Sequence, residues 1–489
     1  MSFNDPKLPE RGVGLTWFPG LEPALESNAG FIDVLEIEPQ MFWRRSPVDQ
    51  SEVVDREVLD GLCANPIPKL IHGVGFPVGG TRLPQPQALE LLAEMARRLD
   101  VPWMSEHLSF NRAAMNSGEH FTSFLLPPRQ TLAGVEAAAR CVRAMASRMP
   151  VPIAVETGVN YLRPRADEIP DGEFAARVVE AADCGILLDL HNIWTNQRNG
   201  RQSVEEFLGE LPLDRVWEIH LAGGSDHRGY WLDAHSGGMP EELFDFAAQV
   251  VRRLPNLKAI IFEFFSAYLP SVGYGVFRSQ LEHMHRLWDM RRDGMPVETR
   301  KRVDVAVADP APSPREWEDT LGTLVVGGTC DTALAGELIE DPGVDITREL
   351  IEQFRASMIV RTLRFSSRLI MLESGSAYLE QLLADYWKEQ PPQPFAFDEA
   401  EGFAAFLRKR DPQIVGFDEI LEYDRAVMAV ALEGAERLIP FTVDPLPVLR
   451  ALGAGRKPDM IFRGHFEILL TPDKSSTASF TPSEKQVIH

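Results

Sequence analysis

Histidine and carboxylate residues in the stretch VWEIHLAGGSDHRGYWLDAH, residues 216–235, have a spacing that suits a divalent metal ion. The run 216–221 has the apolar character of one buried strand, and His220 lies near its end. Asp233 and His235 follow a polar loop and are two residues apart, so on an extended segment their side chains would face the same way. Imidazole and carboxylate groups are common ligands of Fe, Mn and Zn. For any one of these residues alone, a solvated or packed side chain is the simpler interpretation.

Residues of the same types follow other short apolar runs. His72 lies in IHGVGF, Glu106 and His107 in SEHLSF, Glu156 in AVETGV, Asp189 and Asn192 in LLDLHN, and Glu263 in IIFEFF. A polar group within a buried strand is costly unless it is paired or bound to a metal. Because candidate ligands recur at successive runs, the sequence predicts one shared metal site.

The runs that carry these residues belong to a series of eight. They are 13–17, 34–37, 69–74, 103–108, 152–157, 185–190, 216–221 and 259–264. Helical patterns lie between most of them, as in 86–99, 131–147 and 241–253. Eight strand-then-helix units in about 250 residues are typical of the (β/α)8 barrel of the α/β class. The carboxyl ends of all barrel strands point to one face, where the candidate ligands are expected to meet.

Three further residues near these runs have less defined roles. Glu106 and His120 are candidates for substrate contacts, and His120 could also be a ligand or a simple loop residue. His191 would point away from Asp189 if the strand continued, which favours packing or a contact that supports a ligand. The glycines of GVGFPVGG lack the lysine and the spacing of phosphate-binding motifs.

Length and composition limit the class of protein. The 489 residues allow two or three domains, and the formal net charge of −23 argues against a nucleic-acid partner. The four cysteines form no CxxC pattern, which indicates a reducing compartment and no disulfide framework. The sequence has no signal-peptide core and no apolar run of about 18 residues, so we expect a cytoplasmic protein with no membrane span.

The composition changes after residue 294. We expect a barrel domain over 1–294, a proline-rich linker over 295–315, a second domain over 316–472 and a polar, disordered tail over 473–489. The second domain is mainly helical, and its runs 441–443 and 459–470 are strand-like. It has no cluster of catalytic residue types, so its expected role is to bind rather than to react.

The motifs of the first half resemble a known family. GVGLTWFPGLEPAL, IHGVGF, SEHLSF, LLDLHN, IHLAGG with LDAH, and IIFEF resemble, in this order, the multinuclear non-heme iron-dependent oxidases, the MbnB-like family. The resemblance covers roughly residues 10–290. It implies a barrel with two or three iron ions that uses O2 to oxidise a residue, often cysteine, of a ribosomally made precursor peptide. Residues 316–472 are similar, much more loosely, to the MbnC/HvfC-type partner proteins, whose fusion here would make a separate partner unnecessary.

The resemblance also implies a ligand assignment. It gives His72, His107 and Glu156 to one iron, Glu156, Asp189, His220 and Glu263 to a second, and Asn192, Asp233 and His235 to a third. Two residues depart from the family pattern. Phe265 stands where many relatives have an acidic residue, and Thr157 where an asparagine often follows the glutamate. These departures imply an altered pocket, in which cysteine need not be the target.

Three other functions agree with part of the pattern. A trinuclear zinc phosphoesterase of the endonuclease IV type would usually have a histidine at the position of Asn192, and its DNA substrate fits this acidic chain poorly. A metal-dependent sugar isomerase would need a lysine or histidine at the substrate rather than a third metal. A non-catalytic peptide-binding scaffold would not need so many convergent ligands. An O2-dependent oxidase therefore fits the sequence best.

Overall fold

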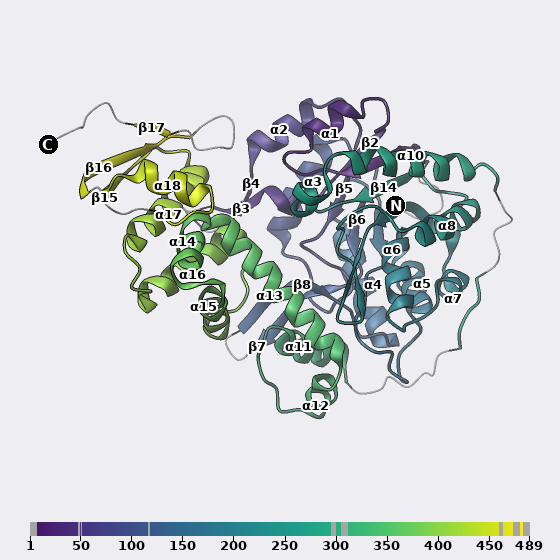
Figure 1. The fold of residues 1–489 in the computed structure, drawn as a ribbon. Coiled ribbons are helices and arrows are strands. Elements are labelled where there is room, and N and C mark those ends of the chain that lie inside the picture. Colours follow the sequence, from purple (N-terminus) through teal and green to yellow (C-terminus); the bar gives the residue numbers. More distant parts are fainter. Residues whose placement is uncertain are drawn as a thin grey trace.

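The first part of the chain is a closed barrel of eight parallel strands (Figure 1), which confirms the predicted fold. The computed structural model describes residues 7–46, 49, 51–115, 118–294, 300–304, 312–458, 463–472 and 480–482. The barrel strands are β1 (Gly12–Thr16), β2 (Val34–Ile37), β5 (Lys69–Gly73), β6 (Met104–His107), β9 (Ile153–Glu156), β10 (Gly185–Asp189), β11 (Val216–Ala222) and β14 (Ala259–Glu263). Each predicted run is one of these strands, and their ends agree to within one residue.

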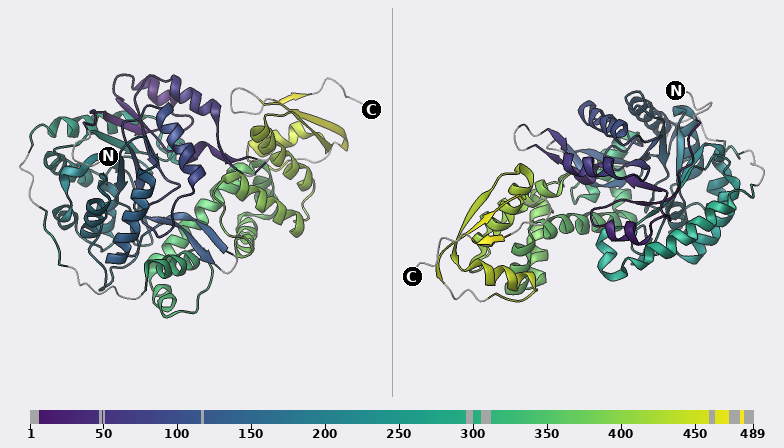
Figure 2. Two further views of the ribbon diagram at one scale, coloured as in Figure 1. Left: turned by 180° about the vertical axis from the view of Figure 1, so that it is seen from behind. Right: turned by 90° about the horizontal axis from the view of Figure 1, so that it is seen from above.

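Helices surround the barrel and cover the outer faces of its strands (Figure 2). The longer ones are α3 (Pro86–Arg98), α4 (Leu132–Ala146), α5 (Asp171–Ala182), α8 (Glu241–Val250) and α10 (Gly275–Met290). The strands β9 and β10 are buried along their whole length, as expected of parallel strands covered on both faces. This packing makes the strand ends a rigid platform for functional side chains.

Three antiparallel hairpins follow barrel strands and therefore rise from the carboxyl-end face. They are β3 (Trp43–Arg45) with β4 (Glu52–Val54), β7 (Phe110–Met115) with β8 (Gly118–Leu126), and β12 (Ser225–His227) with β13 (Tyr230–Leu232). The polar loop expected after His220 is thus the hairpin β12–β13. Together the hairpins border the end of the barrel that contains the candidate ligands.

The second region is mainly helical, as predicted, and it closes with a small sheet. It contains α11 (Pro314–Val325), α12 (Ala333–Ile339), α13 (Pro342–Thr362), α14 (Arg364–Ser374), α15 (Ser376–Glu389), α16 (Ala396–Arg410), α17 (Phe417–Glu433), β15 (Arg437–Val443), α18 (Pro445–Gly453), β16 (Arg463–Leu470) and β17 (Phe480–Pro482). The sheet has the order β15-β16-β17 and is antiparallel.

The second region contains two hydrophobic cores, and the first of them is shared with the barrel. Trp317 and Leu321 of α11 pack with Phe110 and Leu126 of the hairpin β7–β8. The other core lies among α14 to α18 and the small sheet. The helix α13 contributes to both cores, since Val344 near its start belongs to the first and Ile359 near its end to the second. A single continuous helix therefore joins the outer core to the barrel.

The second region also contacts the other two hairpins at the barrel mouth. Arg45 of β3 lies 3.2 Å from the Asp398 carboxylate of α16. Glu349 of α13 accepts a hydrogen bond from Arg228 at 3.0 Å and lies 3.1 Å from His227 Nε2. All three hairpins at the mouth are thus in contact with the second region, which lies beside the candidate site rather than away from it.

Part of the predicted linker is held on the barrel. Arg300 pairs with Glu173 and Glu180 of α5, at 2.6 and 2.8 Å. The rest of 295–311 lies outside the described residues, except 301–304. Within the predicted tail 473–489, Phe480–Pro482 form the strand β17, and the other residues are outside the described part. No helix in the described ranges is long and apolar enough to cross a membrane.

Candidate metal centre

His72, His107 and Glu156 meet at the carboxyl ends of the neighbouring strands β5, β6 and β9. The Nε2 atoms of His72 and His107 lie 3.2 and 2.8 Å from the same oxygen, Glu156 Oε2. The other ring nitrogens are held from outside the cluster, since His72 Nδ1 bonds Ser105 Oγ at 2.8 Å and His107 Nδ1 bonds the Gly73 carbonyl at 2.9 Å. Two imidazole nitrogens and a carboxylate oxygen thus converge as ligands of one ion would.

Asp189 and Asn192 extend this group across β10. Asp189 is the N-cap of α6 (Leu190–Arg198), and its Oδ1 accepts the backbone N–H of Asn192 at 2.8 Å. Asn192 Nδ2 donates to Glu156 Oε1 at 3.1 Å. A ligand atom of Asp189 lies within 4.8 Å of ligand atoms of Glu156 and His220. Glu156 therefore lies between the two groups, as a bridging carboxylate would.

The remaining predicted ligands complete the cluster on the side of β11 and β14. His220 Nδ1 lies 3.2 Å from Glu263 Oε2. His235 Nε2 lies 2.9 Å from Asp233 Oδ1 and 3.5 Å from Glu263 Oε2. His235 has a φ of 46°, in the left-handed region. Asp233 and His235 thus come together as expected, but the backbone at His235 is left-handed and not extended.

The carboxylates of the cluster strongly influence one another. Burial raises the pKa of Asp189 well above its ordinary value, and the nearby Glu263, Glu156 and Asp233 carboxylates add to the effect. Burial acts the same way on Glu156, but the His107 and His72 imidazoles outweigh it and hold its pKa well below the usual range. Burial lowers the pKa of His235, yet the Asp233 and Glu263 carboxylates raise it to about 10. The carboxylates of the site therefore stabilise a positive charge placed among them.

The donor set fits a metal ion. Several buried polar atoms of the cluster have no hydrogen-bond partner within the described part of the chain: Glu156 Oε2, Asp189 Oδ2, Asn192 Oδ1, His220 Nδ1 and His235 Nε2. A buried polar atom without a partner is costly, and a bound cation would remove that cost. The oxygen and imidazole nitrogen donors are types that Fe, Mn and Zn accept.

Sequence reasoning missed three glutamates near the cluster. Glu36 and Glu38 lie on and just after β2, and Glu218 lies on β11. Glu36 Oε1 is 3.0 Å from His220 Nε2, and burial raises the pKa of Glu38, which the His72 imidazole opposes. The signal in the sequence was the pair of carboxylates in VLEIEP at the second predicted strand.

Glu106, His120 and His191 have different surroundings. Glu106 is fully buried and accepts the backbone N–H groups of His107 and Phe76, at 3.0 and 3.3 Å. His120 lies on β8 and belongs to none of the ligand groups found among the described residues. His191 Nδ1 bonds Asp233 Oδ1 at 2.9 Å, which agrees with the predicted supporting contact.

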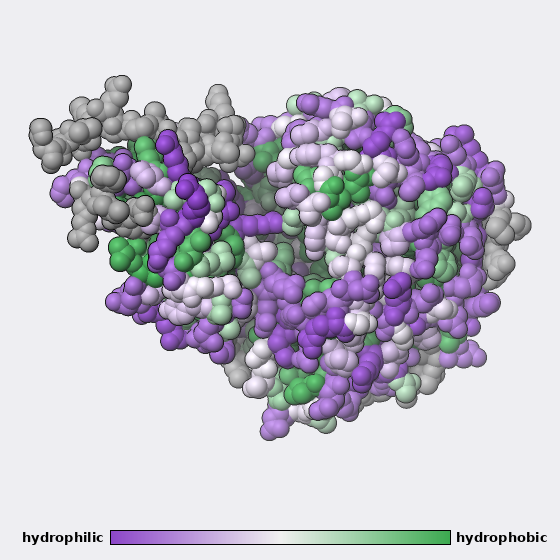
Figure 3. Space-filling model, in the orientation of Figure 1, coloured by the Kyte–Doolittle hydropathy of each residue, from purple (hydrophilic) through white to green (hydrophobic). Residues whose placement is uncertain are grey.

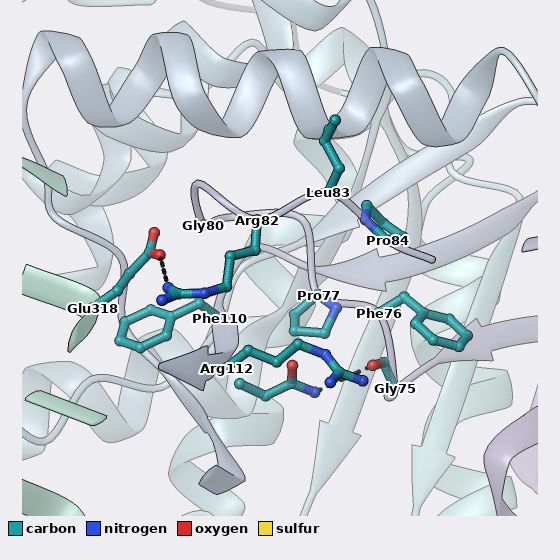
Figure 4. Close-up of a pocket in the computed structure, with 11 residues that line it drawn as sticks. Gly75, Phe76, Pro77, Gly80, Arg82, Leu83, Pro84, Phe110, Arg112 and Glu318 are labelled. Atoms are coloured by element: carbon teal, nitrogen blue, oxygen red, sulfur yellow. Dashed lines mark hydrogen bonds and ion pairs between the residues drawn. The ribbon is translucent and has the colours of Figure 1, made fainter. Parts of the chain in front are cut away.

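Helix α11 holds the loop that follows β5, and a pocket opens between this loop, β7 and α11 (Figure 4). Glu318 of α11 accepts hydrogen bonds from Thr81 N at 2.5 Å, Thr81 Oγ1 at 2.6 Å and Arg82 at 2.7 Å. The same loop reaches Glu106 through Phe76 N. The second region therefore fixes a loop directly beside the candidate ligands.

Relatives among curated proteins match the barrel part of the chain. A UPF0276 protein of Anaeromyxobacter sp. is 29% identical over 242 residues, which are 47% of this chain and 81% of the relative. A UPF0276 protein of Chromobacterium violaceum is 29% identical over 250 residues, 50% of this chain and 87% of the relative. One from Neisseria meningitidis serogroup C is 32% identical over 202 residues, 41% of this chain and 70% of the relative.

Solved structures resemble the barrel with low scores. A xylose isomerase domain protein from Planctomyces limnophilus has 13% identity and a TM-score of 0.38, and covers 58% of this chain and 99% of its own. Endonuclease IV from Thermus thermophilus has 14% identity and a TM-score of 0.36, and the match covers 57% of this chain and 99% of the endonuclease chain. Neither similarity says anything about the activity of this chain.

A family model matches the part of the chain that builds the barrel and its ligand cluster. The model describes the RiPP precursor modification enzymes MbnB/TglH/ChrH, where RiPP denotes a ribosomally synthesised and post-translationally modified peptide, and it matches residues 12–271. These residues are more than half of the chain and include every predicted ligand. The chain belongs to this family of peptide-modifying enzymes.

Proposed function

We propose that the chain is an O2-dependent oxidase that uses two or three iron ions to modify a residue of a ribosomally made precursor peptide. The observation that carries this proposal is the buried cluster of histidines and carboxylates at the barrel mouth of a peptide-modifying family member. The donor types also suit Mn and Zn, so the choice of iron rests on the resemblance of the motifs. Bound iron would supply electrons for the reduction of O2 while the peptide residue is oxidised.

The chain's own residues would hold the ions in three adjacent groups. We assign His72, His107 and Glu156 to the first ion, Glu156, Asp189, His220 and Glu263 to the second, and Asn192, Asp233 and His235 to the third. The shared position of Glu156 supports the first two groups. Asn192 Nδ2 donates to Glu156 Oε1, and this contact would leave Asn192 Oδ1 to bind the third ion.

Phe265 would form part of the wall that the peptide meets. Its side chain is 47% exposed, and its ring lies against the His235 ring with 4.4 Å between the centroids. The phenyl ring gives the mouth an apolar surface at this position. An acidic residue, as in many relatives, would instead repel anionic groups. The modified residue therefore need not be cysteine, since the wall does not select for a particular charge.

The second region would recruit the peptide and need not supply a reacting group. It contacts all three hairpins at the mouth, and its surface is hollowed on the side facing the barrel, with hydrophobic residues on part of the hollow (Figure 3). Packing of α11 and α13 on the barrel holds the region at a fixed place. A peptide bound there would be presented to the mouth at a high effective concentration.

One edge of the small sheet is suited to bind an extended peptide. β16 pairs with β15 along its length, but on its other side only Ile468, Leu469 and Leu470 pair with β17. Within the described residues, the part of β16 before Ile468 is thus unpaired on that side. The outer edge of β15 is less suitable, because Pro440 has no N–H and Thr442 N already donates to Glu419 at 3.1 Å. Strand addition to β16 would give affinity through backbone hydrogen bonds.

Metal content and O2 uptake test the proposed activity. Protein purified without O2 should contain iron, and with a candidate precursor peptide it should consume O2 and change the peptide mass. Zinc content with no O2 uptake would instead favour a phosphoesterase or an isomerase. A peptide that leaves with its mass unchanged, despite bound iron, would refute the oxidation of that peptide.

A truncation near Arg292 is a poor test of the second region. It would remove Trp317, which is 1% exposed, donates to the Pro127 carbonyl at 3.0 Å and lies near the Arg129 and Arg165 guanidinium groups. The barrel would then expose the surface of the shared core, and loss of activity could reflect misfolding. Point variants in the small sheet separate recruitment from folding.

A further inference from the structure

The two ring nitrogens of His220 have different partners. Nε2 lies 3.0 Å from Glu36 Oε1 in a hydrogen bond, and Nδ1 lies 3.2 Å from Glu263 Oε2 without hydrogen-bond geometry. A neutral imidazole has one N–H donor and one acceptor nitrogen, and an ionised carboxylate only accepts. A metal-bound imidazole must be neutral, and in that state the hydrogen bond to Glu36 would place the ring proton on Nε2 and leave the Nδ1 lone pair free for the ion.

We propose that Glu36 is a positioning residue that orients His220 to bind metal through Nδ1. This role depends on the metal centre proposed above, and Glu36 itself is outside the predicted ligand set. Glu36 and His220 are both fully buried, on the strands β2 and β11. These strands are separated in the barrel by β1 and β14, so the two side chains meet across the barrel interior.

Glu36 lies close to groups deeper in the barrel. Ligand atoms of Glu36, Glu218 and His220 lie within 4.8 Å of one another. Trp103 Nε1 donates to Glu218 Oε2 at 2.9 Å, and Trp103 and Glu218 are fully buried. A row of buried groups thus runs from Trp103 through Glu218 and Glu36 to His220, with hydrogen bonds at its two ends.

Two other histidines of the cluster have a comparable arrangement. His72 and His107 are each held at Nδ1, by Ser105 Oγ and the Gly73 carbonyl, and direct Nε2 at Glu156. His220 is held at Nε2 and directs Nδ1 at Glu263. Each of these three rings therefore has one nitrogen fixed from outside and one facing a carboxylate of the cluster. Groups that fix a ligand histidine in this way typically change metal affinity by about 10- to 100-fold when they are removed.

Glu36, Glu218 and His220 could instead hold a cation of their own. Glu36 Oε2 and Glu218 Oε1 are buried and have no hydrogen-bond partner in the described part of the chain. The distances alone therefore permit a separate ion between the two carboxylates. The number of ions bound distinguishes this case from a positioning role, because removal of a positioning residue lowers affinity without removing a separate ion.

The test uses the full chain with Zn²⁺ and Co²⁺ as probe metals. The variants are Glu36→Ala, Glu36→Gln, Glu218→Gln and His220→Ala, and Glu36→Ala is also combined with His220→Ala. Glu173→Gln is the matched control, since Glu173 is a fully buried barrel carboxylate that pairs with Arg177 and Arg300, outside the cluster. Competition with a chelator gives the affinities, elemental analysis gives the number of ions, and the visible spectrum of bound Co²⁺ reports the ligand geometry.

We expect Glu36→Ala to weaken the affected ion by about 10- to 100-fold and to alter the Co²⁺ spectrum. Glu36→Gln should retain more affinity, because its amide oxygen can still accept from Nε2–H. In the His220→Ala background, Glu36→Ala should cause no further loss of affinity, because the histidine through which it acts is absent. The control should match the wild-type chain in all three measurements.

Two results would overturn the role of Glu36. The first is a Glu36→Ala variant with the metal affinity and Co²⁺ spectrum of the wild-type chain, beside a His220→Ala variant that binds metal more weakly. This result would refute the role of Glu36 and leave the metal centre intact. Loss of one whole ion in both Glu36→Ala and Glu218→Gln, at unchanged affinity for the others, would show a cation held by the glutamates themselves. Failure of the wild-type chain to bind either metal would refute the metal centre as well.

Discussion

Asp189 Oδ1 accepts the backbone N–H of Asn192 at 2.8 Å, while Asp189 Oδ2 is buried without a hydrogen bond in the described structure. One carboxylate thus begins the helix α6 with one oxygen and offers the other to the cluster. The strand end, the helix start and a candidate ligand are the same residue. This coincidence ties the position of the ligand to local backbone structure, so it requires no flexible loop.

Substitutions of Asp189 should separate these two roles. Asparagine is a good N-cap, so Asp189→Asn should keep the stability of the chain but lose metal, because the charge and one ligand oxygen are gone. Asp189→Ala should lose metal and also about 1 kcal/mol of stability. Elemental analysis and thermal unfolding of the metal-free proteins measure the two effects. Equal metal content in Asp189→Asn and the wild-type chain would remove Asp189 from the ligand set.

Glu156→Ala should remove more than one ion. Its Oε2 lies between His72 and His107, and it belongs to a second group with Asp189 and His220. A bridging carboxylate stabilises two ions, so its loss should exceed that of a residue bound to one. Elemental analysis beside His107→Ala, which affects the first group alone, provides the comparison. If Glu156→Ala loses no more metal than His107→Ala, the bridging assignment is wrong.

A buried carboxylate in the second region should make its stability depend on pH. Asp424 of α17 is 3% exposed and accepts hydrogen bonds from Ser366 N and Oγ, both at 2.7 Å. Burial raises the pKa of Asp424 from 3.8 to about 6, against the effect of these hydrogen bonds. The folded chain therefore binds the proton more tightly than the unfolded chain does. Protonation of Asp424 therefore stabilises the folded chain fully below about pH 4, and this stabilisation is lost as the pH rises through about 6.

Asp424→Asn should remove this dependence. In the wild-type chain, protonation of Asp424 contributes about 3 kcal/mol more to the free energy of unfolding below about pH 4 than above about pH 6, because each pKa unit corresponds to about 1.4 kcal/mol. Unfolding of the outer core, followed between pH 4 and 7, should show a smaller fall in the variant than in the wild-type chain. Glu373→Gln, at an exposed ion pair with Lys457, is a control that should leave the slope nearly unchanged. Parallel slopes for Asp424→Asn and the wild-type chain would contradict the prediction.

The barrel and most of the cluster of candidate ligands could be predicted from the sequence. Strands such as β9 and β10 are buried on both faces and so read as continuous apolar runs, in which Glu156 and Asp189 stand out. Glu36 was missed because residues 35–38 alternate apolar and acidic types, a pattern that usually indicates a solvent-facing side. In a closed barrel the second face is the interior, where Glu36 meets His220.

Two other features depend on tertiary contacts that no local pattern encodes. The left-handed backbone of His235 brings it to Asp233, and only the folded loop determines that conformation. Trp317 fits the amphipathic pattern of α11, but nothing in that pattern shows that its partners are barrel residues. The predicted domain boundary at residue 316 therefore assigns α11 to the second domain, although α11 completes a core that it shares with the hairpin β7–β8 of the barrel.

Peptide recruitment should depend on the edge of β16 that has no partner strand before Ile468 among the described residues. Glu467 lies opposite Pro440, which has no N–H to donate, so this pair is not hydrogen-bonded within the ladder. The Glu467 N–H then points away from β15, toward the unpaired side. Glu467→Pro should remove a donor for an added strand without breaking a bond between β15 and β16. We expect at least a tenfold weaker binding of the precursor peptide, since a lost backbone hydrogen bond and the proline ring both oppose strand addition.

Leu438→Pro is the matched control for this prediction. Leu438 is two residues before Pro440 on β15, so its N–H points to the outer edge, and its side chain is 53% exposed. Both variants place a proline in the same sheet at a position outside the ladder, but only Glu467→Pro affects the proposed peptide edge. Fluorescence anisotropy with a labelled precursor peptide measures affinity, and turnover at saturating peptide measures the barrel. Glu467→Pro should raise KM and leave kcat close to the wild-type value, while Leu438→Pro should change neither. Equal peptide affinity of the two variants would exclude β16 as the recruiting edge. A fall in kcat alone in Glu467→Pro would show that this sheet supports the fold and does not recruit the peptide.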